Sequence, residues 1–261
     1  MQSDMVQFDF ASAIRRTNNR TCFVSTMSHL SILQLLGVDE QHLLPVPGHA
    51  ASVRMHRQVI APISELIDAA SQAGFDLRIA SGFRSFERQL HIWNNKCLGC
   101  RPVLDMHGTP LKVEQLSLAE KVHAILYWSA LPGASRHHWG TDCDIYDASA
   151  VADDYIVQLH PDEYTGSGPF APMMQWLQGW FDQQAQTAFY RPYWCNPHSG
   201  IASEPWHISY YPLSKRYEPQ LSVQALKDYW CSLGDGVLEE KEYLLNELDT
   251  IYHQYIQTSP R

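Results

Sequence analysis

The sequence lacks long apolar runs. No stretch approaches the roughly 20 consecutive apolar residues of a membrane-spanning helix. The first thirty residues also lack the apolar segment of about seven to fifteen residues that marks a secretory signal. Charged residues interrupt them instead, namely Asp4, Asp9, Arg15, Arg16 and Arg20. These absences give no sign of a signal peptide or a membrane span, and taken alone they predict a cytoplasmic protein.

Positive charge is also scarce. The chain has 19 Lys and Arg against 28 Asp and Glu, which gives a formal net charge of -9. General binders of nucleic acid or of anionic membranes need clustered Lys and Arg that displace counterions. We therefore expect no nucleic-acid partner.

The six cysteines, at positions 22, 97, 100, 143, 195 and 231, are scattered and form no disulfide framework. Cys97 and Cys100 make a CxxC pair, but a structural zinc site needs two more ligands and the chain has no second pair. We interpret the pair as part of a loop, with a local disulfide or metal clip as the alternative. Cys143 lies between Asp142 and Asp144, whose charges raise the pKa of a thiol, so we exclude it as a nucleophile.

Two segments contain the residue types of a catalytic zinc site. The first runs from Ser135 to Asp144 (SRHHWGTDCD) and the second is Glu204-Pro205-Trp206-His207. A hydrolytic zinc site needs three protein ligands, an open position for water, and a nearby carboxylate that accepts the proton of that water. The ligands can come from His137, Asp144 and His207, and the proton acceptor can be Glu204.

These segments resemble the VanY-type D-alanyl-D-alanine carboxypeptidases of the LAS group of zinc metallopeptidases. The family pattern is Ser-x-His-x-x-Gly-x-Ala-x-Asp followed downstream by Glu-x-Trp-His or Glu-Pro-Trp-His. A further family element, Ser-Gly-Phe/Tyr-Arg-Ser followed by Gln, is present as residues 81–85 and Gln89. The resemblance covers roughly residues 46–217. It departs from the pattern at Asp142, where the family usually has a small apolar residue.

The resemblance implies one zinc ion per chain, held by the three ligands named above, and Glu204 as the general base. It implies that Arg84 binds the substrate or stabilises the developing oxyanion, and a guanidinium suits either task because it is a permanently charged, planar donor. By the same resemblance Ser135 contacts the terminal carboxylate of the substrate. Gln89 contacts the substrate or holds Arg84 in place.

Two expectations concern the geometry of the site. Residues 141–146 alternate as a strand does, so Asp142 and Asp144 should point to the same face. We prefer Asp144 as the ligand because its spacing from His137 is that of the family, and we expect Asp142 to orient a histidine. His138 should point away from His137, toward solvent or the wall of a cleft.

In a regular strand Glu204 and His207 would face opposite ways. Pro205 disfavours a helical conformation at Glu204. A bend at Pro205 is therefore required if both side chains are to reach one metal ion.

We predict an α+β fold, with a small, mostly antiparallel sheet flanked by helices. The resemblance implies the fold shared by VanY-type peptidases and the hedgehog signalling domain. We expect an N-terminal extension over residues 1–45, a catalytic domain over 46–217, and a C-terminal helical extension over 218–261 that packs on the domain. The predicted helices cover 30–36, 52–73, 85–97, 117–129, 171–184 and 218–257. The predicted strands cover 75–79, 142–147 and 206–211.

By resemblance, the reaction is removal of a C-terminal D-alanine from a peptidoglycan stem peptide. The alternatives are an L,D-carboxypeptidase, a D,D-dipeptidase or a stem-peptide endopeptidase on the same scaffold, or a non-catalytic zinc-containing module that binds peptidoglycan. Glu204 argues against the last, because a purely structural zinc site has no use for a proton acceptor. Most such peptidases act in the cell envelope, so two locations stay open. The protein trims recycled wall peptides in the cytoplasm, or it is exported to the cell envelope by a route that the sequence does not reveal. Nothing in the sequence indicates an oligomeric state.

Overall fold

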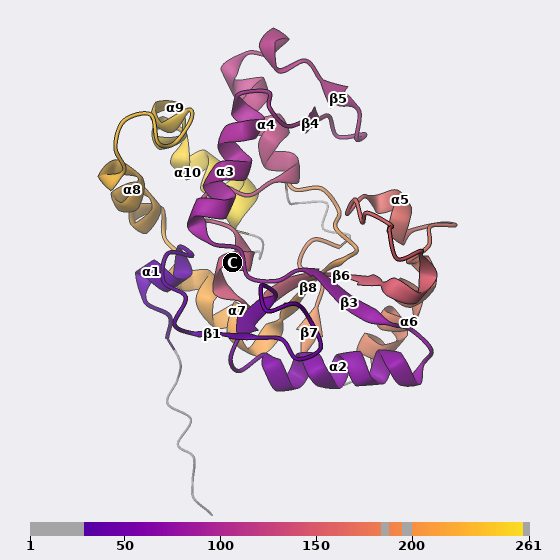
Figure 1. Cartoon of the computed structure of the whole chain (residues 1–261). Helices are drawn as coiled ribbons and strands as arrows, with labels where there is room; N and C mark the ends of the chain where they lie inside the picture. Colours follow the sequence, from indigo (N-terminus) through magenta and orange to yellow (C-terminus); the bar gives the residue numbers. More distant parts are fainter. Residues whose placement is uncertain (1–28, 184–187, 195–199, 258–261) are drawn as a thin grey trace, which may run out of the picture.

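The computed structural model describes residues 29–183, 188–194 and 200–257. In these segments helices surround small antiparallel sheets, which confirms the predicted α+β class (Figure 1). The strands are β1 Leu43–Pro45, β2 Arg54–His56, β3 Leu77–Ser81, β4 Val103–Leu104, β5 Pro110–Leu111, β6 Asp142–Asp147, β7 Phe189–Tyr190 and β8 His207–Tyr210. The α-helices are α1 Ile32–Leu35, α2 Ile60–Gln72, α3 Phe86–Cys97, α4 Leu118–Trp128, α5 Pro161–Tyr164, α6 Ala171–Gln183, α7 Tyr211–Tyr217, α8 Val223–Ser232, α9 Lys241–Asn246 and α10 Leu248–Ile251. Shorter or wider helical turns are η1 Val113–Gln115, η2 Arg136–Trp139, η3 Ala148–Ala150, η4 Glu218–Gln220 and the π-helical η5 Tyr252–Ile256.

The sheet that carries the candidate site has the strand order β3-β6-β8-β7, and each neighbouring pair is antiparallel. Strand β6 therefore lies between β3 and β8. Its Cys143 and Ile145 are wholly buried in the hydrophobic core. Asp142 and Asp144, one position before each of these, point to the other face, where both contact His207. This alternation confirms both the predicted strand over 142–147 and the shared face of the two acids.

Helices cover both sides of this sheet. Figure 1 shows α2 running below β3, while α3 and α4 rise side by side above the sheet. The buried positions of α2 are Ile63, Leu66 and Ala70, whose helical spacing places them on one face. The predicted helix over 52–73 is wrong in its first part, because residues 54–56 form β2 and pair with β1.

Serine caps set the starts of α3 and α4. The hydroxyl of Ser85 accepts a hydrogen bond from the Arg88 N–H at 3.2 Å. Ser117 forms a capping box with Glu120. These caps satisfy backbone N–H groups that have no partner within the helix. They confirm the predicted helices over 85–97 and 117–129.

The predicted helical segment 218–257 is divided into several short pieces rather than one continuous helix. The chain turns sharply between α8 and α9, where Gly236 and Glu240 have φ of 73° and 60°. The segment packs on α3, because the indole N–H of Trp93 donates to the carbonyl of Glu239 at 3.0 Å. None of the helices in the described segments combines the length and the apolar character that crossing a bilayer requires.

Candidate metal centre and active site

The three candidate ligands come from three elements that meet at one edge of the sheet. His137 lies in η2, Asp144 on β6, and His207 at the start of β8, directly opposite Asp144 in the strand register. Gly140 joins η2 to β6 with φ of 68°, and a Cβ there would lie 2.7 Å from the backbone nitrogen of His56. The turn that delivers His137 to the site therefore requires glycine.

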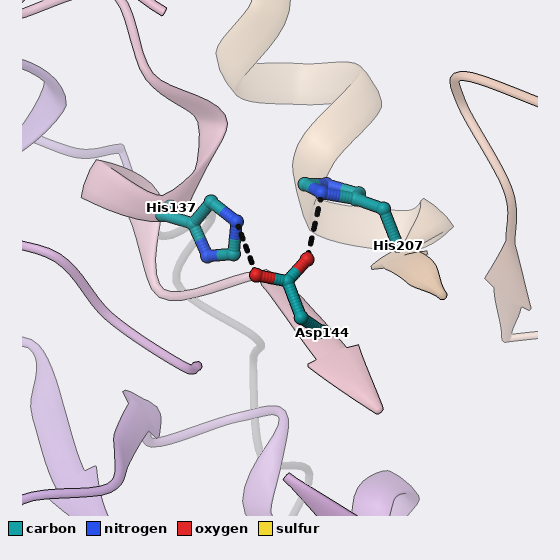
Figure 2. Close-up of side chains that lie close together, drawn as sticks. All are labelled: His137, Asp144 and His207. Carbon is teal, nitrogen blue, oxygen red and sulfur yellow. Dashed lines mark ion pairs between the residues drawn. The ribbon is translucent and has the colours of Figure 1, made fainter. Parts of the chain in front are cut away.

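The ligand atoms converge on a single point. His137 Nε2 lies 3.4 Å from Asp144 Oδ2, and His207 Nδ1 lies 3.2 Å from Asp144 Oδ1. Figure 2 shows the two imidazoles directed at the carboxylate of Asp144. One ligand atom from each residue lies within 4.8 Å of the other two, and all three residues are buried.

Hydrogen bonds behind the imidazoles set their tautomers. His137 Nδ1 lies 2.8 Å from the carbonyl of Gly82, which can only accept, so Nδ1 carries the proton. On His207 the other nitrogen, Nε2, lies 2.9 Å from the carboxylate of Asp142. In a neutral imidazole the nitrogens that face Asp144 are then lone-pair acceptors. A metal-binding histidine usually donates the N–H of its other ring nitrogen to a carbonyl or carboxylate oxygen in this way.

This arrangement suits a cation. Two imidazole lone pairs face carboxylate oxygens, and acceptors repel each other unless a positive species lies between them. Asp144 Oδ1 is buried and makes no hydrogen bond of normal geometry among the described residues, although His207 Nδ1 is near. Two imidazoles and one carboxylate form the donor set of a catalytic zinc site with one open position. The residues present therefore fit zinc.

The electrostatics point the same way. Burial opposes protonation of His207, but the nearby carboxylates of Asp142, Asp144 and Glu204 outweigh it and raise the pKa of His207 well above its usual value. Burial raises the pKa of Asp144, yet His137 and His207 reverse this effect and hold it far below the ordinary range. Three carboxylates around one imidazole thus favour positive charge at this point.

Glu204 borders the ligands from a tight turn. The N–H of His207 donates to the carbonyl of Glu204 at 3.2 Å, and Pro205 lies inside this turn. The predicted bend at Pro205 is therefore confirmed. Glu204 Oε2 lies 3.3 Å from His207 Nδ1, and the side chain is 15% exposed. The carboxylate also lines a cavity of about 370 Å³ beside the ligands.

Arg84 approaches the site from the turn between β3 and α3, as the sequence predicts. Its Nη2 lies 3.9 Å from Asp144 Oδ2. Nη1 donates to Gln89 Oε1 at 3.0 Å and Nη2 to Ser81 Oγ at 3.2 Å. Gln89 is wholly buried and donates in turn to the carbonyl of Ala130 at 2.7 Å. Gln89 therefore holds the guanidinium beside the candidate metal centre.

Ser135 is buried and lines the same cavity as Glu204. His138 is placed differently from the expectation, because it is wholly buried rather than on a cleft wall or in solvent. Its Nδ1–H donates to the carbonyl of Arg84 at 2.6 Å, and its Nε2 accepts from the N–H of Gly133 at 3.0 Å. His138 thus ties η2 to the turn that carries Arg84.

Sequence reasoning missed Arg136. Its Nε donates to Asp142 Oδ2 at 2.7 Å, and its Nη2 donates to the hydroxyls of Ser209 and Tyr190 at 2.9 Å each. Arg136 and Asp142 are both buried. One sequence signal could have indicated this pair. Arg136 lies six residues before Asp142, whose strand is predicted to be partly buried, and a buried acid needs a partner of opposite charge.

Sequence reasoning also missed most of the cavity wall. Besides the motif residues, the wall includes Lys96, Arg101, Tyr193 and Tyr255. Of the CxxC pair, Cys97 ends α3 as a buried residue and Cys100 is exposed, and both are free thiols. Cys22 and Cys195 lie outside the described residues.

Comparison with known sequences decides the family. Residues 52–213 match the VanY family of D-alanyl-D-alanine carboxypeptidases. The chain belongs to the VanY family. The match contains all three motif segments and confirms the predicted resemblance. It makes the chain a peptidase of the carboxypeptidase class that acts on the peptides of peptidoglycan.

An uncharacterized protein of Haemophilus influenzae is 32% identical over 127 residues, which are 48% of this chain and 92% of that protein. The structure of VanYB in complex with D-alanine-D-alanine is 20% identical, with 76% of this chain and 94% of that chain covered and a TM-score of 0.46. The structure of the LD-carboxypeptidase LdcB is 20% identical, with 75% and 80% covered and a TM-score of 0.45.

Proposed function

We propose that the chain is a zinc-dependent carboxypeptidase that removes a C-terminal D-alanine from peptidoglycan stem peptides. Family membership supports the proposal, and the position of Glu204 carries it. The carboxylate of Glu204 borders three candidate ligands and the cavity, where a structural site would have no use for it.

In this proposal His137 and His207 bind one zinc ion through Nε2 and Nδ1, and Asp144 binds it through a carboxylate oxygen. The bound ion would lower the pKa of a water molecule in its open position and polarise the scissile carbonyl. Asp142 holds the ring of His207 from behind.

The remaining steps belong to side chains around the cavity. Glu204 accepts a proton from the attacking water and returns it to the amine of the departing D-alanine. Arg84 stabilises the oxyanion that develops on the carbonyl, since its guanidinium is held close to Asp144. Gln89 fixes the orientation of Arg84, and the hydroxyl of Ser135 contacts the substrate from the cavity wall.

Mass spectrometry of stem pentapeptide and tetrapeptide, each incubated with the zinc-loaded protein, tests the reaction. Loss of one D-alanine from the pentapeptide, abolished by a chelator, is the expected result. Loss from the tetrapeptide alone would replace the proposal with L,D-carboxypeptidase activity, and release of a dipeptide would replace it with dipeptidase activity. Intact peptides in every sample would contradict a peptidase acting on these stems.

The Glu204→Gln variant tests the mechanism. Removing a general base lowers turnover by about 10²- to 10⁴-fold, and glutamine is too weak a base to substitute. We expect zinc content, measured by elemental analysis, to stay at one ion per chain because Glu204 is not a ligand. Glu242→Gln, on an exposed acid of α9, is the matched control and should keep full activity. Unchanged turnover in Glu204→Gln would contradict the mechanism.

A further inference from the structure

A second group of positive charges lies in the cleft beyond Arg84. Lys96 is on the last turn of α3, and Arg101 follows shortly after the helix ends. Both side chains are half-buried, and both line the cavity that contains Glu204. Arg84, Lys96 and Arg101 thus line one cleft, although the chain as a whole has a net charge of -9.

Neither cation forms an ion pair in the part of the chain that the structure describes. Among the described residues, no carboxylate lies within 4.0 Å of Lys96 or Arg101, whereas Arg84 has Asp144 at 3.9 Å. Lys96 Nζ instead donates to the neutral hydroxyl of Ser129 at 2.7 Å. Burial, together with the charges of Arg101 and Arg84, lowers the pKa of Lys96 to about 8. Like charges held together in a cleft repel each other, and a bound anion relieves that repulsion.

The position of Glu204 indicates which anion binds there. Glu204 and Lys96 line one cavity, and the charge of Glu204 acts on Lys96. If Glu204 returns a proton to the amine of the leaving group, that amine lies beside Glu204. In a leaving group of one amino acid, a single carbon separates the amine from the carboxylate. The carboxylate then lies among the cavity residues around Glu204, which include Lys96, whereas a longer leaving group would carry its carboxylate farther from Glu204.

We propose that Lys96 and Arg101, with the Ser129 hydroxyl, form a subsite that binds the free terminal carboxylate of the substrate. This inference rests on the proposed carboxypeptidase function and adds to it the reason for cleavage at the last residue. Arg84 is held at Asp144 by Gln89 and Ser81, and is therefore available for the reacting carbonyl. Ser135 lines the same cavity but contributes no charge.

Binding measurements in the Glu204→Gln background test the subsite without hydrolysis. The probes are the stem pentapeptide with a free terminal carboxylate and the same peptide with a terminal amide, each titrated by calorimetry into zinc-loaded protein. We expect the acid to bind at least about tenfold more tightly than the amide, a ratio that corresponds to about 1.4 kcal/mol. Adding Lys96→Met should weaken binding of the acid peptide but not of the amide, and so remove most of this preference. Adding Lys96→Arg should retain the preference.

Lys112→Met is the matched control, because Lys112 is exposed, lies outside the cavity and has the same charge. It should leave the preference unchanged. If Lys96→Met does not fold by circular dichroism, Arg101→Met is assessed in the same way. Two results would overturn the subsite. One is an undiminished preference for the acid after Lys96→Met is added, and the other is equal binding of acid and amide to the Glu204→Gln protein. Hydrolysis of the pentapeptide by the wild type would still support the proposed function in either case. If neither peptide bound and the wild type cleaved neither, both proposals would fail.

Discussion

At the scale of single residues, Asp142 uses both of its oxygens. Oδ2 accepts from Arg136 at 2.7 Å and lies 2.9 Å from His207 Nε2. Oδ1 accepts from the hydroxyls of Thr141 at 2.6 Å and Ser209 at 2.9 Å. Burial raises the pKa of Asp142, but the charge of Arg136 and the bonds to His207 and Thr141 more than reverse this effect and keep it ionised. The resemblance leads one to expect a small apolar residue at position 142. The buried Arg136, which needs a counter-charge, explains why an acid stands there.

Asp142→Asn should destabilise the protein. It leaves the buried Arg136 without its counter-charge, and breaking a buried pair in this way costs about 3 to 5 kcal/mol. Loss of the carboxylate behind His207 should also weaken zinc binding by about 10- to 100-fold. Urea unfolding with and without zinc measures both effects. Asp153→Asn, on an exposed acid, is the control, and equal unfolding midpoints for the two variants would show that the pair contributes little.

At the scale of elements, one face of α3 serves both the core and the site. Phe86 and Trp93 are buried in the hydrophobic core. Gln89 and Lys96 lie three residues after Phe86 and Trp93 respectively, so they are beside them on the same side of the helix. Gln89 contacts Arg84 there, and Lys96 lines the cavity. The start of this helix therefore sets the positions of Gln89 and Lys96 relative to Arg84.

Ser85→Ala removes the cap of α3. We expect a loss of about 1 kcal/mol in the free energy of unfolding, because the Arg88 N–H loses its side-chain partner. Ser85→Asp keeps a capping oxygen and should stay close to the wild type. Thermal or urea unfolding compares the three proteins. An alanine variant as stable as the aspartate variant would show that this cap does not stabilise the fold.

Elements with local signals were predictable from the sequence, and elements that depend on distant partners were not. Ser85 and Ser117 mark helix starts through contacts within three residues, so those starts are confirmed. Residues 54–56 also fit a helical spacing, but they become β2 because β1 lies beside them. The ligand set could be proposed from its motif spacing. The burial of His138 and the partner of Asp142 depend on packing between separate segments, which spacing alone does not describe.

At the scale of the whole molecule, a pair of buried histidines, His42 and His56, should make stability depend on pH. The rings of His42 and His56 are 5.5 Å apart, and burial lowers the pKa of each to about 4. In the unfolded chain each should titrate near its ordinary value of about 6.5. Between these values the unfolded chain binds protons that the folded chain does not. Stability is therefore complete above pH of about 6.5 and falls as the pH drops through about 4.

Urea midpoints of chelated protein between pH 7 and pH 4 measure this dependence. Chelation removes the separate effect of zinc release on stability. We expect the midpoint to fall with pH, and to fall less steeply when His42 and His56 are both replaced by asparagine. His253→Asn, on an exposed histidine of η5, should leave the slope unchanged. Parallel curves for the wild type and the double variant would exclude the pair as the source.

The segment after the family match also completes the cleft. Tyr255 and Ile256 of η5 line the cavity, and the Tyr255 hydroxyl lies 2.7 Å from His123 Nδ1 on α4. The indole of Trp230 donates to the carbonyl of Pro132, just before the ligand turn η2. Because a ribosome makes the chain from its N-terminus, every proposed catalytic residue emerges before this wall exists. A nascent chain that has reached only His207 therefore contains every proposed catalytic residue but not yet the part of the cavity wall that Tyr255 and Ile256 supply.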